Sequence, residues 1–134
     1  MAQPGKPDVE CKISPELLSQ IDAIALGGRQ GRTTAARLVW KAGVVVITSR
    51  ATGSGLTGIV GEVAKLLPEF EDVPLGSKLL KFNVLDKDLE RLKAIAQLQD
   101  KKTAQLHRNA LAIGIWVYAQ IAIVMAAVDE AQPE

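Results

Sequence analysis

The chain has 134 residues and a mass of 14.3 kDa, which suits one ordinary domain or two very small modules sharing a core, and excludes a multidomain enzyme. Apolar residues make up 48% of it and charged residues 23%, which excludes a disordered polymer. Sixteen basic and 15 acidic residues give a net charge of +1, without the basic excess that is typical of nucleic-acid-binding proteins.

The scarcity of cysteine and histidine excludes a zinc module. A structural zinc site needs four ligands and a catalytic one about three, mostly Cys and His, and the chain has one of each. Cys11 cannot form an internal disulfide, and residues 1–10 lack the apolar core of a signal peptide. We therefore expect a cytoplasmic protein without a metal or other cofactor.

An internal repeat appears when the chain is compared with itself at an offset of 71 positions. Further apolar positions coincide, such as Ile21 with Leu92 and Val44 with Ile115. The identical pairs are Leu18 and Leu89, Ala23 and Ala94, Ile24 and Ile95, Ala25 and Ala96, Arg37 and Arg108, and Gly43 and Gly114.

The first repeat covers residues 8–48, after a flexible N-terminus at 1–7. Residues 9–13 alternate apolar and polar, which predicts a short strand with one buried face. Ser14 followed by Pro15 is typical of a helix start, and Gly27-Gly28 of its end. A second helix is predicted from the turn at Gly31-Arg32-Thr33-Thr34 to about Thr48.

A linker at residues 49–79 follows. It opens with a flexible break around Gly53-Ser54-Gly55, and apolar residues from Leu56 to Leu67 then recur with the spacing of a short amphipathic helix. The segment from Pro68 to Pro74 ends this helix. We expect the helix to pack on the shared core.

The second repeat covers residues 80–128. A strand is predicted at 80–84, a helix from the acidic start around Asp86 and Asp88, and a longer helix from about Thr103 to Val128, before an acidic tail at 129–134. Each repeat, counted over 1–50 and 80–118, has seven basic and four acidic residues, whereas the linker and the tail are acidic. The near-neutral total is therefore a cancellation between segments.

Strand, helix, turn and helix in about 40 residues resemble the ribbon-helix-helix family of DNA-binding proteins, the Arc and MetJ type. The resemblance covers about residues 8–48 and 79–118. In that family two copies intertwine and their strands pair as an antiparallel ribbon, which enters the major groove of DNA. It implies a mainly α fold with a short two-stranded antiparallel ribbon and additional helices, formed as a pseudo-dimer within one chain.

The resemblance also implies site residues. The outward side chains of the strands would read bases, since lysine donates to guanine and asparagine bridges adenine; Glu10 fits this role less well, because phosphates repel a carboxylate. The base-reading candidates are Glu10, Lys12, Lys81 and Asn83. The start of each second helix would bind phosphate through free N–H groups and the helix dipole. The phosphate candidates are Arg32, Thr33, Thr34, Lys101, Lys102 and Thr103.

Other residues that could carry chemistry are expected to be structural. His107 has no catalytic partner nearby in sequence, Cys11 alternates inward, and Asp86 and Asp88 suit the first turn of a helix. No enzyme is expected. The chain is interpreted as a DNA-binding regulator such as a repressor or antitoxin, or as a plasmid or relaxosome accessory factor, with double-stranded DNA as its partner.

Two alternatives remain open. The chain could be a non-DNA assembly protein in which the ribbon only joins subunits. It could also be anchored in a membrane by residues 110–128, which contain no charge and are long enough to span. We favour burial of this segment in protein, with residues 121–128 packed under the linker helix or forming a homo-oligomer interface.

Overall fold

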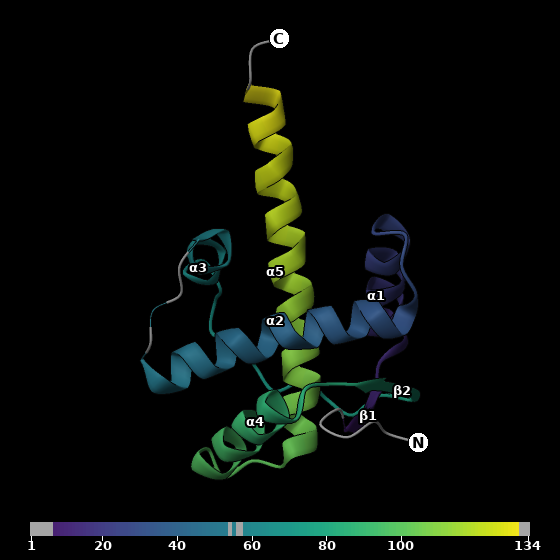
Figure 1. Ribbon diagram of the computed structural model, residues 1–134, viewed down its shortest axis with the longest axis vertical. Helices are drawn as coiled ribbons and strands as arrows, with labels where there is room; N and C mark the ends of the chain where they lie inside the picture. The colour runs from purple at the N-terminus through teal and green to yellow at the C-terminus, as the bar shows by residue number, and fades with distance from the viewer. Residues whose placement is uncertain (1–6, 54, 56–57, 132–134) are drawn as a thin grey trace.

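The computed structural model describes residues 7–131, except 54, 56 and 57. Within these residues the chain forms five helices and a two-stranded sheet. Figure 1 shows two long helices, α2 (Arg32–Thr52) and α5 (Thr103–Ala131), that cross near the middle of the molecule. The fold is therefore mainly helical with a short antiparallel ribbon. This agrees with the fold class predicted from the sequence.

The ribbon consists of β1 (Asp8–Ile13) and β2 (Lys78–Asn83), paired antiparallel. Burial alternates along β1, with Val9, Cys11 and Ile13 buried and the residues between them exposed. This alternation arises because successive side chains of a strand point to opposite faces. The predicted strand at 80–84 is shifted, since β2 begins at Lys78 and Val84 lies beyond its end.

Helix α1 (Pro15–Gly27) begins as predicted, because the Ser14 hydroxyl accepts a hydrogen bond from the Leu17 backbone N–H at 3.1 Å. Helix α4 (Asp86–Leu98) follows β2 and has two acidic residues in its first turn. Helices α1 and α4 match at the offset of 71 positions, both where they begin and where they end. The starts of α2 and α5 are separated by the same offset. Arg29 and Asp100, the residues in the two turns whose backbone has the left-handed conformation, are also separated by this offset.

The crossing of α2 and α5 depends on two glycines. A Cβ atom added to Gly43 would overlap the backbone carbonyl of Ala110, and one added to Gly114 would overlap the carbonyl of Val39. The two helix backbones therefore touch directly. This close approach forms the centre of the core, which Trp40 and Phe82 fill with fully buried rings.

The linker differs from the prediction in two respects. Helix α3 (Gly58–Ala64) is shorter than the predicted helix at 56–67, whose first two residues lie outside the described part of the chain, and α2 continues past Thr48 to Thr52. The reason for the second difference is that Gly53, in the left-handed conformation at φ 75°, provides the end of α2. Val63 and Leu67 are buried, so the linker does pack on the core.

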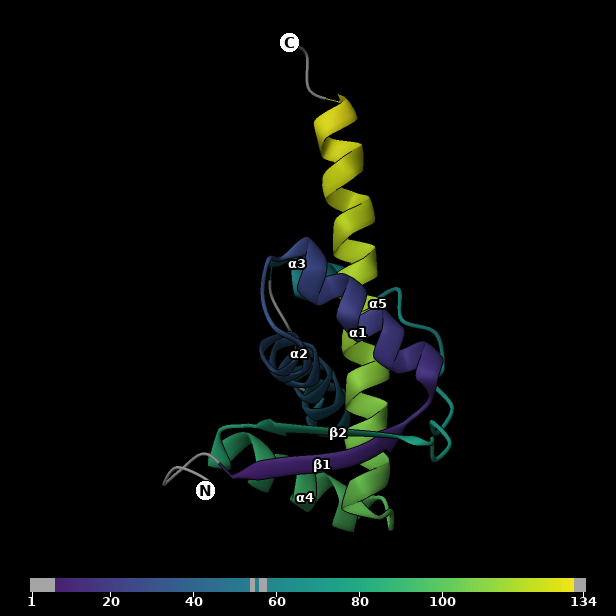
Figure 2. The same ribbon diagram turned by 90° about the vertical axis from the view of Figure 1, so that its right-hand side faces the viewer.

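The long helix α5 is only partly buried. Leu111 and Val117 are fully buried, but every residue from Ala122 to Val128 is exposed, so the expected packing of residues 121–128 under the linker helix is wrong. Figures 1 and 2 show this end of α5 projecting beyond all other elements. The reason is that α3 covers only the middle of α5. The predicted tail begins within α5, and residues 1–6 and 132–134 lie outside the described chain.

Candidate functional site

The outer face of the ribbon carries most of the predicted base-reading side chains. Glu10, Lys12 and Lys81 are exposed, and Asn83 is half-buried. Glu10 lies opposite Lys81 in the centre of the ribbon, and Asp8 lies opposite Asn83 at one end. The structure therefore brings all four candidates together, with Asp8 as an additional polar member.

Ion pairs hold part of this face together. The Lys81 Nζ lies 3.5 Å from Oε1 of Glu10 and 3.6 Å from Oδ2 of Asp8, and the Asn83 side-chain amide donates a hydrogen bond to Asp8. Lys12 forms no ion pair within the described residues and is the candidate with the least competition for its ammonium group. Arg37, from α2, donates through Nε to the backbone oxygen of Asn83 at 2.9 Å and fixes the end of β2.

The start of α2 exposes its backbone to solvent. Its N-cap is Gly31, which makes no side-chain capping hydrogen bond, and Arg32, Thr33 and Thr34 are all exposed. Free N–H groups at a helix N-terminus attract anions. Arg32, however, forms a two-bond ion pair with Asp22 of α1, at 2.8 and 2.9 Å, which lowers the pKa of the Asp22 carboxyl.

The start of α5 is held by the linker instead. Lys101 Nζ lies 2.8 Å from Oδ1 of Asp72, and these hydrogen bonds, first from Lys101 and then from Asn109, hold the pKa of Asp72 below its usual range. The Asn109 side chain also accepts from the Val73 backbone N–H at 2.8 Å. Of the three candidates here, Lys102 is exposed, Thr103 is half-buried and Lys101 is paired with the linker.

The ribbon lies between the two helix starts. In Figure 1 it occupies the lower right, with the N-terminal end of α2 above it and that of α5 below it, and Figure 2 shows the same order from the side. The elements that carry the base-reading and phosphate candidates therefore lie next to one another. We call this region, made of β1, β2 and the first turns of α2 and α5, the ribbon face.

Sequence reasoning missed two residues that contact the candidate side chains. Asp8 was missed because the first strand was predicted to begin one residue too late, although Asp8 continues the alternation of Glu10 and Lys12. Asp72 was missed because nothing local in the linker indicates that it reaches Lys101, which is 29 positions away.

Three polar side chains are buried in the protein and do not belong to the exposed surface of the ribbon face. His107 is buried, and its Nδ1 accepts a hydrogen bond from the Trp40 indole at 3.0 Å; burial, and then Lys93, lower the pKa of His107 to about 4. Burial raises the pKa of Cys11 to about 11. Asp88 does more than begin a helix, because its buried carboxylate binds Lys41 of α2 at 2.7 Å through both oxygens.

These groups do not gather into one site. The described residues contain no group of three or more His, Cys, Asp or Glu side chains that could hold a metal ion. One described helix, Thr103–Val128, is long and apolar enough to cross a membrane, with a mean hydropathy of 2.2, as the core helix of a soluble protein also can be. Comparison with protein-family models, with curated proteins and with solved structures finds no match to this chain.

Proposed function

We propose that this chain is a single-chain ribbon-helix-helix protein that binds double-stranded DNA in the cytoplasm, as a transcriptional regulator or a plasmid or relaxosome accessory factor. The two repeats would act as the two halves of a pseudo-dimer. The observation that carries the proposal is the position of the ribbon between the starts of α2 and α5. A major groove is wide enough for a two-stranded ribbon, and the phosphates on its two sides would then meet the two helix starts.

The four base-reading candidates would contribute unequally. Lys12 can donate to guanine N7 and O6 without giving up an ion pair in the protein. Lys81 must break its ion pairs with Glu10 and Asp8 before it can contact a base, which reduces its net contribution to the free energy of DNA binding. Once Lys81 turns to the DNA, the Glu10 carboxylate can accept from the amino group of cytosine. Asn83 must likewise release Asp8 before it can bridge an adenine.

The phosphate contacts would be asymmetric as well. At the start of α2, the uncapped backbone and the hydroxyls of Thr33 and Thr34 are available to a phosphate, and Arg32 lies beside them. At the start of α5, Lys102 and Thr103 are available, while Lys101 is paired with Asp72. The two strands of the ribbon also differ in sequence. We therefore expect an asymmetric DNA site in place of a strict inverted repeat.

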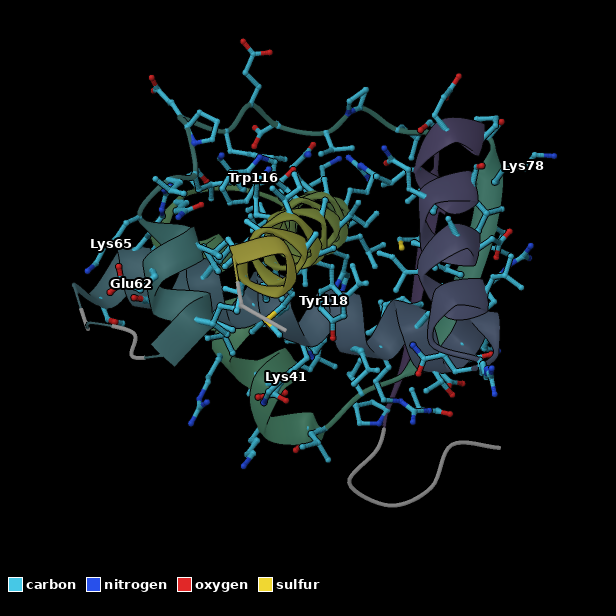
Figure 3. All side chains as sticks on the ribbon, turned by 90° about the horizontal axis from the view of Figure 1, so that it is seen from above. Lys41, Glu62, Lys65, Lys78, Trp116 and Tyr118 are labelled. Atoms are coloured by element: carbon cyan, nitrogen blue, oxygen red, sulfur yellow. The ribbon has the colours of Figure 1, made fainter. Side chains whose placement is uncertain are left out.

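Titration of the purified protein with duplex DNA at about 50 and 200 mM salt tests the proposal. Binding should weaken steeply with salt, because phosphate contacts release counterions. The double variant Lys12→Ala with Lys81→Ala should weaken binding to a selected site by about 1–3 kcal/mol for each lost base contact. Lys65→Ala is the matched control, since Lys65 is an exposed lysine on the opposite side of the molecule from Lys78 of the ribbon (Figure 3).

The control should bind DNA like the unaltered protein. Equal weakening by Lys65→Ala and by the ribbon variant would show that the ribbon has no special role. Absence of binding to any duplex would overturn the proposal and leave the second candidate, an assembly protein in which the ribbon only joins the two halves. The observation that favours this second candidate is the projecting end of α5.

A further inference from the structure

The C-terminal part of α5 has few neighbours among the described residues: Ile121 is still partly buried against the core, but every residue from Ala122 to Val128 is exposed. We call residues 119–128 the projecting segment. Figures 1 and 2 show it extending beyond α1, α2 and α3. Ile123 is 61% exposed and Met125 49% exposed, and the segment contains no charged residue. Its exposed apolar residues are Ala119, Ala122, Ile123, Val124, Met125, Ala126, Ala127 and Val128.

The exposed apolar residues of this segment are expected to be buried against another molecule. Surface helices normally place polar residues on the face that meets water, and a helix that is apolar on all sides is normally buried. Here Ile123 and Val124 lie about 100° apart around the helix, and both are exposed. The cover must therefore reach more than one side of α5, and the body of the same chain does not.

A membrane does not fit this segment. The first part of the apolar run, residues 110–117, belongs to the protein core, where Gly114 touches Val39 and Val117 is fully buried. Ten residues remain, and at 1.5 Å per residue they extend about 15 Å, half the thickness of a bilayer core. Asp129 and Glu130 follow at once, and acidic residues are expelled from lipid.

A second copy fits in only one orientation. Figure 3, which looks along α5 from its projecting end, shows α1 on one side of α5, α3 on the other, and α2 passing beneath. The body is therefore wider than α5 on these sides. Packed helices lie 8–10 Å apart, so two copies placed side by side in parallel would collide at their bodies before their projecting segments met.

We propose that two copies of this chain associate through their projecting segments in antiparallel orientation. Each segment then lies along one side of the other copy's segment, with its tip against the partner's α1 or α3, whichever lies on that side. This second contact is needed because a stable interface buries about 800 Å² on each partner, more than a ten-residue helix face supplies. Leu26 of α1 and Leu66 beside α3 are highly exposed apolar residues that suit this contact.

The antiparallel pair has a consequence that rests on the proposed function. The ribbon lies near the N-terminal end of α5, at the opposite end of the molecule from the projecting segment (Figure 1). Two ribbons would therefore lie at opposite ends of the pair and bind two separate DNA segments. The association itself is independent of DNA and is measured without it, so its failure and the failure of DNA binding are distinguishable.

The oligomeric state tests the association. Light scattering coupled to size-exclusion chromatography should give twice the chain mass at micromolar concentration, without detergent or DNA. The double variant Ile123→Glu with Val124→Glu should give the mass of one chain with unchanged helix content by circular dichroism. Leu98→Glu is the control, because Leu98 is an apolar residue 82% exposed at the far end of α4, and this variant should remain a dimer.

Cysteine cross-linking tests the orientation. Cys11 does not interfere, because it is buried and its thiol has a pKa of about 11. Equal amounts of the variants Gln120→Cys and Val128→Cys, mixed and exposed to oxidised glutathione, should form mainly the mixed disulfide-linked pair. Self-linked Val128→Cys chains as the main product would overturn the antiparallel arrangement.

A single-chain mass for the unaltered protein at all concentrations would overturn the association. Sedimentation with vesicles of phosphatidylcholine and phosphatidylserine, abolished by Ile123→Glu with Val124→Glu, would also overturn it and assign the projecting segment to a lipid surface.

Discussion

At the scale of single residues, the contact between Trp40 and His107 shows how the core distinguishes the two halves of the chain. The indole donates to the His107 ring, and Trp40 also packs edge-on against Phe82 with ring centroids 6.2 Å apart. At the offset of 71 positions, Trp40 corresponds to Leu111 and His107 to Ala36. The contact therefore occurs once and requires one copy of each half.

The burial of His107 makes the stability of the protein depend on pH. The pKa of His107 falls from 6.5 to about 4 on folding, so the unfolded chain binds the proton more readily. The free energy of unfolding should therefore decrease as the pH falls from about 6.5 to about 4, by at most about 3 kcal/mol. Urea unfolding at several pH values measures this loss.

The matched variant for this prediction is His107→Asn. Its side-chain oxygen can still accept from the Trp40 indole, and it has no proton to gain in this range. The loss of stability on acidification should be smaller in the variant by the contribution of His107. Identical pH dependence in both proteins would contradict the prediction, since carboxylates titrate in both.

At the scale of elements, local patterns predict where a helix or strand begins better than what it packs against. Ser14-Pro15 and the alternation around Cys11 gave the starts of α1 and β1 within one residue. The hydrogen bonds that hold Asp72 and Val73 of the linker could not be predicted, because the side chains that form them are 29 and 36 positions away. The same limit applies to the ribbon face, whose outward residues follow from alternation while the partners of Lys81, Arg32 and Lys101 depend on tertiary contacts.

The crossing of α2 and α5 gives a prediction at this scale. Gly43→Ala should destabilise the protein by about 3 kcal/mol, because the new methyl group meets backbone of Ala110 that has no freedom to move aside. This loss opposes the gain of about 1 kcal/mol that alanine normally brings to a helix. Denaturant midpoints measure the balance.

Gly27→Ala is the control for the crossing. Gly27 is the last residue of α1, and a Cβ atom there would meet nothing within 4 Å. The control should be neutral or slightly more stable. A stabilising effect of Gly43→Ala would show that the two helices do not touch as closely as described.

At the scale of the whole molecule, the charges of the ribbon favour pairing between the two different halves. Glu10 and Lys81 correspond at the offset of 71 positions and also lie directly opposite each other. Pairing of two first halves would place Glu10 opposite Glu10, and pairing of two second halves would place two lysines together. Like charges directly opposite in a sheet are destabilising, so this central pair favours the arrangement within one chain.

An exchange of the two charges tests this account. Glu10→Lys should lower the free energy of unfolding by about 0.5–1 kcal/mol, because it places two lysines at the centre of the ribbon. Adding Lys81→Glu should restore part of the loss, because opposite charges then face each other again at the centre of the ribbon, while the new carboxylate also repels Asp8, which pairs with Lys81 in the unaltered protein. The free energies of unfolding of the two single variants and the double variant together give the interaction energy between positions 10 and 81, separate from the effect of each substitution alone. If the double variant is as unstable as the sum of the single ones, the two side chains act independently, and the choice of partner must come from the core contacts around Trp40 instead.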